Sequence, residues 1–254
     1  CTMLDKIAQL RQMLDESRYT VALCGSGMLE EGGLEGLKKQ ERAYSIEEKY
    51  GWGVEEMYTS VFYNTRPEKF FDFYKNEILR NIPRETAAAG ALADMERAGR
   101  LQCIIDTNVY EQMERGGCRN VINLHGSIYR NQCPRCGRMY PISYILDAKR
   151  VPLCETCNVP VRPQVSLTGE MVDSQNMTRT TQEIGRADVL LLLGTTLASE
   201  VFEQYVKYFS GRYLVVIHKK EHYTDRGADL LIMDYPMNVL PLLHYEKETG
   251  EDGQ

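Results

Sequence analysis

Four cysteines form two pairs whose spacing is typical of a structural zinc site. Cys133 and Cys136 make one Cys-x-x-Cys pair, Cys154 and Cys157 make a second, and seventeen residues lie between the pairs. Two thiolates from each pair can surround one Zn²⁺ as a closed tetrahedron with no open coordination position. Four unrelated cysteines are the alternative interpretation, which this spacing disfavours. Because a closed site holds a fold and does no Lewis-acid chemistry, we expect the reactive groups elsewhere.

His125 is the first candidate for such a reactive group. It begins a His-Gly-Ser sequence that directly follows an apolar run, residues 120–124. Cys133 lies eight positions further along the chain. An imidazole titrates near neutral pH and is therefore a common general base. A histidine at the end of a strand is also often a structural hydrogen-bonding residue, and the residue alone leaves both interpretations open.

Two glycine-bearing turns follow apolar runs. Gly25-Ser26-Gly27 comes after residues 20–24, and Gly194-Thr195-Thr196 comes after residues 188–193. Glycines let backbone amides approach a phosphate, and ligands of open α/β sheets gather at the carboxyl edge of the strands. Glu30 stands where the dinucleotide fingerprint has its third glycine, which disfavours a hydride-transferring dehydrogenase. A tight turn that binds nothing remains an alternative.

These groups need a scaffold, and the sequence predicts an α/β fold. Short apolar runs alternate with helical stretches, as in a parallel sheet covered by helices on both faces. Strands are expected at residues 20–24, 101–106, 120–124, 188–193, 213–217 and 229–233. Residues 38–80, rich in aromatic and charged side chains, are expected to form a helical module, and residues 129–163 a zinc module.

We therefore expect a Rossmann-like domain made of residues 1–37, 81–128 and 164–254, and a small domain made of the two modules. The tail from residue 246 onward is expected to be disordered.

Composition excludes several other classes of protein. The 254 residues carry a net charge of −6 and no Lys/Arg run, so we expect no direct contact with nucleic acid. No apolar run is long enough to span a membrane, and the N-terminus lacks a secretory pattern. The remaining cysteines, Cys1, Cys24, Cys103 and Cys118, show no framework spacing. We therefore expect no disulfides and a cytoplasmic location.

The order of these motifs along the chain resembles that of the sirtuins, which are NAD-dependent protein deacylases. The resemblance covers about residues 4–243. The motifs that carry it are Gly25-Ser26-Gly27-Met28, Thr107-Asn108, Leu124-His125-Gly126-Ser127, the two cysteine pairs, Arg162-Pro163, Gly169-Glu170, Gly194-Thr195-Thr196-Leu197 and Ala228-Asp229-Leu230. It implies a Rossmann-like domain, a small domain, and NAD and an acylated lysine of a protein or peptide as ligands.

The resemblance also implies roles for individual residues. In sirtuins the acyl oxygen displaces nicotinamide from the ribose, a histidine base activates a ribose hydroxyl, and the acyl group ends on ADP-ribose. His125 would be the base and Asn108 would order the ribose. The remaining cofactor-binding positions would be Gly25, Ser26, Gly27, Thr107, Gly194, Thr195, Thr196 and His218, and the zinc ligands would be the four paired cysteines.

The chain departs from the sirtuin pattern near the nicotinamide and the acyl-lysine. Residues 33–38 lack the usual Pro, Asp, Phe and Arg, and Tyr110 replaces an aspartate that holds the nicotinamide carboxamide. Ser166-Leu167-Thr168 replaces an apolar Val-Trp-Phe. The resemblance makes deacetylation the first expectation. The departures leave two alternatives open: mono-ADP-ribosyl transfer, and a module that binds NAD or ADP-ribose with little turnover.

Overall fold

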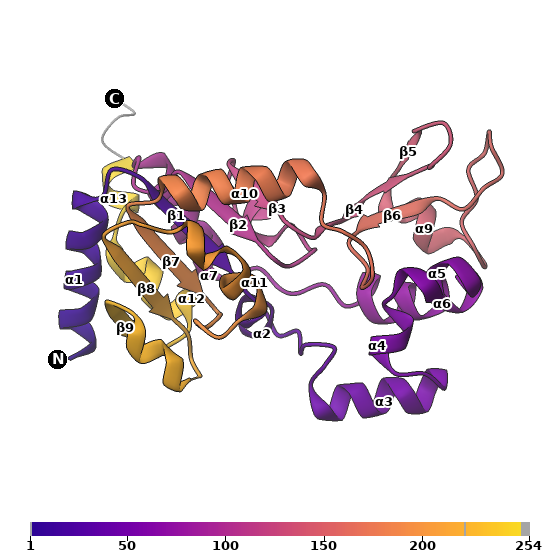
Figure 1. Ribbon diagram of the computed structural model, residues 1–254, viewed down its shortest axis with the longest axis horizontal. Helices are drawn as coiled ribbons and strands as arrows, with labels where there is room; N and C mark the ends of the chain where they lie inside the picture. Colours follow the sequence, from indigo (N-terminus) through magenta and orange to yellow (C-terminus); the bar gives the residue numbers. More distant parts are fainter. Residues whose placement is uncertain (1, 221, 250–254) are drawn as a thin grey trace. The chain divides into compact units, whose positions relative to one another are not determined.

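The computed structural model describes residues 2–220 and 222–249 and divides the chain into two compact units (Figure 1). The sheet unit comprises Cys1–Gly33, Arg84–Leu124 and Asp173–Gln254. The cysteine unit comprises Leu34–Pro83 and His125–Val172. These bounds lie within nine residues of those expected from the sequence, and the assignment of functional domains stays a prediction.

The sheet unit is built on six parallel strands. In chain order they are β1 (Thr20–Cys24), β2 (Cys103–Asp106), β3 (Val121–Asn123), β7 (Val189–Leu193), β8 (Tyr213–Ile217) and β9 (Leu230–Ile232). Their spatial order is β3-β2-β1-β7-β8-β9, the doubly wound order of the Rossmann fold. Each strand falls inside an apolar run that predicted it.

Helices cover both faces of this sheet (Figure 1). The helices of the unit are α1 (Met3–Glu16), α2 (Gly27–Glu31), α7 (Ala87–Arg97), α8 (Gln112–Arg115), α10 (Ser174–Arg186), α11 (Glu200–Tyr205), η2 (Val206–Tyr208), η3 (Tyr223–Gly227), α12 (Pro236–Val239), η4 (Leu240–Leu243) and α13 (Glu246–Thr249). The expected parallel sheet with helices on both faces is confirmed.

The side chains of each strand point alternately to the two faces of the sheet, which explains why helices cover both faces. On β1, Ala22 and Cys24 belong to a core cluster with Leu10 of α1 and Leu92 of α7. Successive side chains of a strand point to opposite faces, so Val21 and Leu23, which are also buried, point to the opposite face of the sheet. All of β1 and β7 is buried, as the continuous apolar runs predict.

The cysteine unit contains a three-stranded antiparallel sheet. Its strands are β4 (Gly126–Gln132), β5 (Met139–Tyr140) and β6 (Arg162–Val165), in the order β5-β4-β6. Its helices are α3 (Gln40–Tyr50), α4 (Val54–Met57), α5 (Ser60–Thr65), α6 (Pro67–Phe73), the π-helix η1 (Tyr74–Leu79) and α9 (Ile142–Asp147). The sequence did not indicate this small sheet.

Aromatic packing holds the helical part of this unit together. Phe70, Phe71 and Tyr74 are fully buried, and Tyr63 meets Phe70 edge-on with ring centroids 5.0 Å apart. Edge-to-face pairs of this kind add roughly 0.5–1.5 kcal/mol each to the burial of the rings. The buried aromatic residues Phe62, Tyr63, Phe70, Phe71, Phe73 and Tyr74 therefore form much of the core of the helical module, whereas Tyr44 is exposed.

The expectation of a disordered tail is wrong for its first four residues, because Glu246–Thr249 form α13. Tyr245, directly before this helix, is buried and donates its hydroxyl to Asp15 of α1 at 2.8 Å, which fixes the start of the tail. The rest of the predicted tail, residues 250–254, lies outside the described residues.

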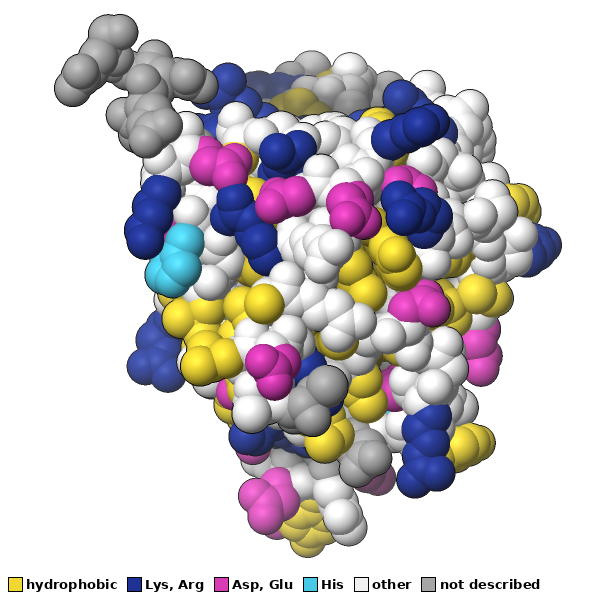
Figure 2. Space-filling view, turned by 90° about the vertical axis from the view of Figure 1, so that its left-hand side faces the viewer, with side chains coloured by type: hydrophobic (Ala, Val, Ile, Leu, Met, Phe, Trp, Pro, Cys, Tyr) yellow, Lys and Arg dark blue, Asp and Glu magenta, His cyan; other side chains and the backbone are white. Residues whose placement is uncertain are grey.

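The surface over α1 mixes charges of both signs (Figure 2). Basic and acidic side chains alternate there with smaller areas of hydrophobic side chains. Among the described residues, no helix is long and apolar enough to cross a membrane.

Candidate functional site

Two turns meet at the point where the strand order reverses, between β1 and β7. The backbone N–H of Gly27 donates to the carbonyl of Gly194 at 2.8 Å. A Cβ on Gly27 would lie 2.7 Å from the Gly194 Cα, and one on Gly25 would lie 2.5 Å from the Thr195 Cβ. Gly194 has a φ of +64°. The glycines therefore allow two loops to pack backbone against backbone.

The same turns present backbone amides that the protein does not use. Among the described residues, the amide N–H groups of Ser26, Thr195 and Thr196 have no hydrogen-bond acceptor. Ser26 is exposed and the two threonines are half-buried, so a ligand can reach them. Amides and hydroxyls at a topological switch point form a donor set suited to the phosphates of a nucleotide.

Asn108 connects the end of β2 to the first turn. Its side-chain Nδ2 donates to the Gly25 carbonyl at 2.9 Å, and its backbone N–H donates to the Asp106 carboxylate at 2.9 Å. Thr107 donates its hydroxyl to the Cys24 carbonyl at 2.7 Å. Thr107 and Asn108, both predicted to bind the cofactor, thus lie at the carboxyl edge, and Asn108 also supports the turn.

Asp106 is a buried carboxyl that sequence reasoning missed. It is fully buried, one of its oxygens has no partner among the described residues, and burial raises its pKa to about 7. Glu31 of α2 is similar to Asp106, because burial raises the pKa of Glu31 to about 7 as well. The Glu31 carboxyl accepts the Met237 N–H at 2.9 Å. The charged residue types gave no sequence signal, since such side chains are rarely buried.

His218 and Asp225 lie at the same edge, beyond β7. His218 directly follows β8, and burial lowers the pKa of its imidazole. Asp225, also missed from the sequence, is fully buried and accepts the Leu197 N–H at 2.9 Å. That bond fixes the loop that carries Thr195 and Thr196.

His125 begins the second segment of the cysteine unit. Its carbonyl accepts the Ser166 N–H at 2.9 Å, while burial lowers the pKa of its imidazole. Neither ring nitrogen has a hydrogen-bond partner among the described residues. Gly126 has a φ of +86°, and a Cβ there would lie 1.9 Å from the Gln164 carbonyl oxygen. Only glycine therefore fits after this histidine.

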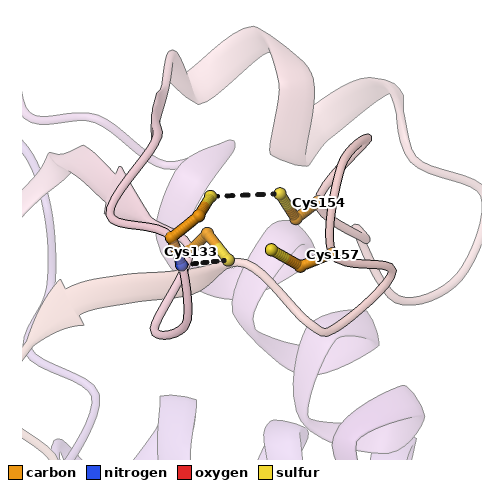
Figure 3. A group of neighbouring side chains, drawn as sticks. Cys133, Cys154 and Cys157 are labelled. Atoms are coloured by element: carbon orange, nitrogen blue, oxygen red, sulfur yellow. Dashed lines mark hydrogen bonds between the residues drawn. The ribbon is translucent and has the colours of Figure 1, made fainter.

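The four paired cysteines converge as expected (Figure 3). Their sulfur atoms all lie within 4.8 Å of one another. Cys133 and Cys136 lie between β4 and β5, and the Sγ of Cys133 accepts the Cys136 N–H at 3.5 Å. Cys154 and Cys157 come from the loop before β6. Four thiols at this separation fit one tetrahedral Zn²⁺.

Tyr140 supports this cysteine cluster from β5. Its hydroxyl donates to the Cys154 Sγ at 3.2 Å and accepts the Glu155 N–H at 2.9 Å. The hydrogen bond from Tyr140 lowers the pKa of the Cys154 thiol and favours the thiolate that binds metal. The other described cysteines, Cys24, Cys103 and Cys118, are free and buried, whereas Cys1 lies outside the described residues.

The predicted residues thus fall into two groups. The sheet unit holds the turn residues, Thr107, Asn108 and His218 at the carboxyl ends of its strands. The cysteine unit holds His125 and the four cysteines. Their roles in binding and catalysis stay predictions.

The family model described as the Sir2 family matches residues 25–201, which include the turns, His125 and the cysteine cluster. The chain belongs to the Sir2 family.

Two relatives share most of their length with this Sir2 family protein. A Cutibacterium acnes protein named NAD-dependent protein deacetylase is 37% identical over 226 residues, which cover 89% of this chain and 92% of the relative. A Clostridium acetobutylicum protein of the same name is 30% identical over 239 residues, covering 94% and 98%.

A solved Sir2 homolog–NAD complex superposes with a TM-score of 0.80 at 28% identity. The superposition covers 95% of this chain and 94% of that one.

Proposed function

We propose that this Sir2 family protein is an NAD-dependent protein-lysine deacylase that transfers an acyl group to ADP-ribose and releases nicotinamide. The observation that carries the proposal is the pair of packed turns with unused amides at the β1/β7 switch point. The Cutibacterium acnes relative, named for NAD-dependent deacetylation, supports deacetylation as the default reaction.

The turns supply the binding of the dinucleotide. The amides of Ser26, Thr195 and Thr196 would hold its phosphates, because a backbone N–H needs an acceptor and these have none among the described residues. Thr107, Asn108 and His218 would contact its riboses. When bound, NAD supplies the ribose carbon whose bond to nicotinamide is broken.

His125 supplies the base. Because burial lowers the pKa of its imidazole, the ring is neutral at pH 7 and can accept a proton at a ring nitrogen. The Ser166 hydrogen bond and the tight approach of Gly126 to Gln164 hold its backbone in place. The zinc held by the cysteine cluster would stabilise the small sheet that carries this backbone.

The test is an assay of nicotinamide release with NAD and an acetyl-lysine peptide. We expect release that requires the peptide and yields an acylated ADP-ribose. His125→Ala is expected to abolish it and to leave ADP-ribose binding within a factor of about two, whereas His244→Ala, at an exposed histidine, serves as the matched control. Full activity in His125→Ala would remove His125 from the mechanism.

Mono-ADP-ribosyl transfer is the second candidate, and Tyr110 favours it. Tyr110 stands where sirtuins carry the carboxylate that holds nicotinamide, and it is only 5% exposed. A buried phenol cannot accept amide hydrogens as a carboxylate does. Transfer of label from NAD to a protein, without deacylated peptide, would favour this reaction. Tight ADP-ribose binding without any nicotinamide release would favour a binding module.

A peptide or protein bearing an acylated lysine is the substrate that this function requires. We place the protein in the cytoplasm, which the free thiols of Cys24, Cys103 and Cys118 support, since a reducing compartment keeps thiols unpaired. Cell fractionation followed by detection of the chain tests the location.

A further inference from the structure

A cavity in the cysteine unit lies outside all the residues assigned above. It has a volume of about 710 Å³, within the range of small-molecule sites. Residues 65–69, 72 and 75 line it from α5, α6 and η1, and residues 149–151 line it from the loop after α9. These segments lie side by side, because α9 packs against η1.

The lining is strongly basic although the chain is acidic. Five cationic residues line the cavity: Arg66, Lys69, Lys75, Lys149 and Arg150. Only Glu68 and Asp72 oppose them, which leaves a net charge of +3 in a chain whose net charge is −6. Cations concentrated against the overall charge attract an anion.

Lys75 is the buried cation of this cavity, and the backbone of the opposite loop holds its ammonium in place. The residue is buried, with only 8% of it exposed. The ammonium donates to the carbonyls of Ala148, at 2.5 Å, and Arg150, at 3.5 Å, which ties η1 to the loop after α9. Burial lowers the pKa of Lys75. An ammonium has three N–H donors, so one remains for a ligand.

The two carboxylates do not neutralise the cations of the lining, although Arg66 and Lys69 also lie over the ring of Trp52, at 5.7 and 4.2 Å from its centroid. Arg150 meets Glu68 at 3.6 Å, but both side chains are more than 60% exposed, and such pairs contribute little. Asp72 accepts a hydrogen bond from Asn76 at 3.0 Å, on its own helical face. Lys149 forms no ion pair with any described residue.

We propose that this cavity binds a small anion that carries two or more linked phosphate groups. Arginine forks and lysine ammonium groups both suit phosphate, and a net charge of +3 matches such a ligand better than it matches a single carboxylate. The cavity shares no residue with the proposed NAD-binding turns, so the inference stands independently of the proposed function.

The experiment is a calorimetric titration of the full chain with sodium tripolyphosphate at low salt. We expect the double variant Lys149→Glu/Arg150→Glu to weaken binding by about tenfold or more, because four units of charge change at the cavity. Lys38→Glu/Arg130→Glu makes the same change of charge at two exposed residues of the same unit that do not line the cavity. It should bind as the unaltered protein does.

A reciprocal variant separates the cavity from the NAD-binding turns. Ser26→Glu places a carboxylate on the first turn, and we expect tripolyphosphate to bind it normally. Loss of binding in Ser26→Glu with retention in the cavity variant would overturn the proposal. Equal weakening in the Lys38/Arg130 control, or equally tight binding of a glutamate oligomer, would overturn it too. Lys75→Met, with its melting temperature as a check on folding, should also weaken binding.

Discussion

The side-chain amide of Asn108 donates a 2.9 Å hydrogen bond to the carbonyl of Gly25, so the end of β2 holds the turn after β1. Asn108→Ala removes this buried bond, which is worth about 1–1.5 kcal/mol. We therefore expect the affinity for ADP-ribose to fall about tenfold, measured by calorimetry. Asn120→Ala, at an exposed asparagine before β3, is the control. Equal affinity in both variants would show that the turn keeps its shape without Asn108.

Catalysis should depend on pH through His125. Burial holds the pKa of this imidazole below its usual value, and the neutral ring is the active base. The rate at low substrate concentration should rise with pH on the acid side, with an apparent pKa below 6.5, and then level off. If the rise in rate had its midpoint above pH 7, the ionisation of another group would limit the reaction.

Asp106 should make stability fall as pH rises. Burial raises its pKa from the ordinary 3.8 to about 7 in the folded chain, so between these values the folded state binds a proton that the unfolded state has released. The contribution is full below about pH 4 and is lost as pH rises through about 7. Its size is at most roughly 4 kcal/mol.

The measurement is denaturant unfolding of the wild type and Asp106→Asn across this range. Asparagine keeps an oxygen for the Asn108 N–H and does not ionise. The wild type should therefore lose stability relative to the variant between pH 5 and 7. Parallel curves would show that Asp106 titrates normally.

The Tyr140 hydroxyl should strengthen metal binding. Tyr140→Phe removes its hydrogen bonds to the Cys154 sulfur and the Glu155 amide while keeping the ring. We expect one zinc per chain in both proteins and a roughly 10- to 100-fold lower zinc affinity in the variant, measured by competition with a chelator. Tyr129→Phe, at a half-buried tyrosine of β4, is the control. Finding no zinc in the wild type would refute the Cys₄ site.

Glycine substitutions should separate a required glycine from a replaceable one. Gly194→Ala combines a φ of +64° with a Cβ only 2.7 Å from the Met28 nitrogen, so we expect a loss of roughly 2–4 kcal/mol. Gly90→Ala, inside α7 with nothing within 4 Å, should gain roughly 0.5–1 kcal/mol. Thermal unfolding of both variants measures the contrast.

The sequence predicted the parallel sheet well because its strands are continuous apolar runs, such as residues 189–193. It predicted the cysteine cluster because ligand spacing is local. It did not predict the partners of Glu31, whose hydrogen-bond donor is 206 residues away in Met237. Nor did it predict the sheet of β4, β5 and β6, whose strands are partly exposed and are not continuous apolar runs. Contacts between distant segments leave no periodic pattern.

Strand β4 begins directly after His125 and ends directly before Cys133. One seven-residue strand, whose pairing with β6 shifts register between Gly126 and Asn131, therefore joins the proposed proton acceptor to the first metal ligand. Damage to the metal cluster, whether by oxidant or by mutation, would therefore also disturb the backbone that carries the proposed proton acceptor.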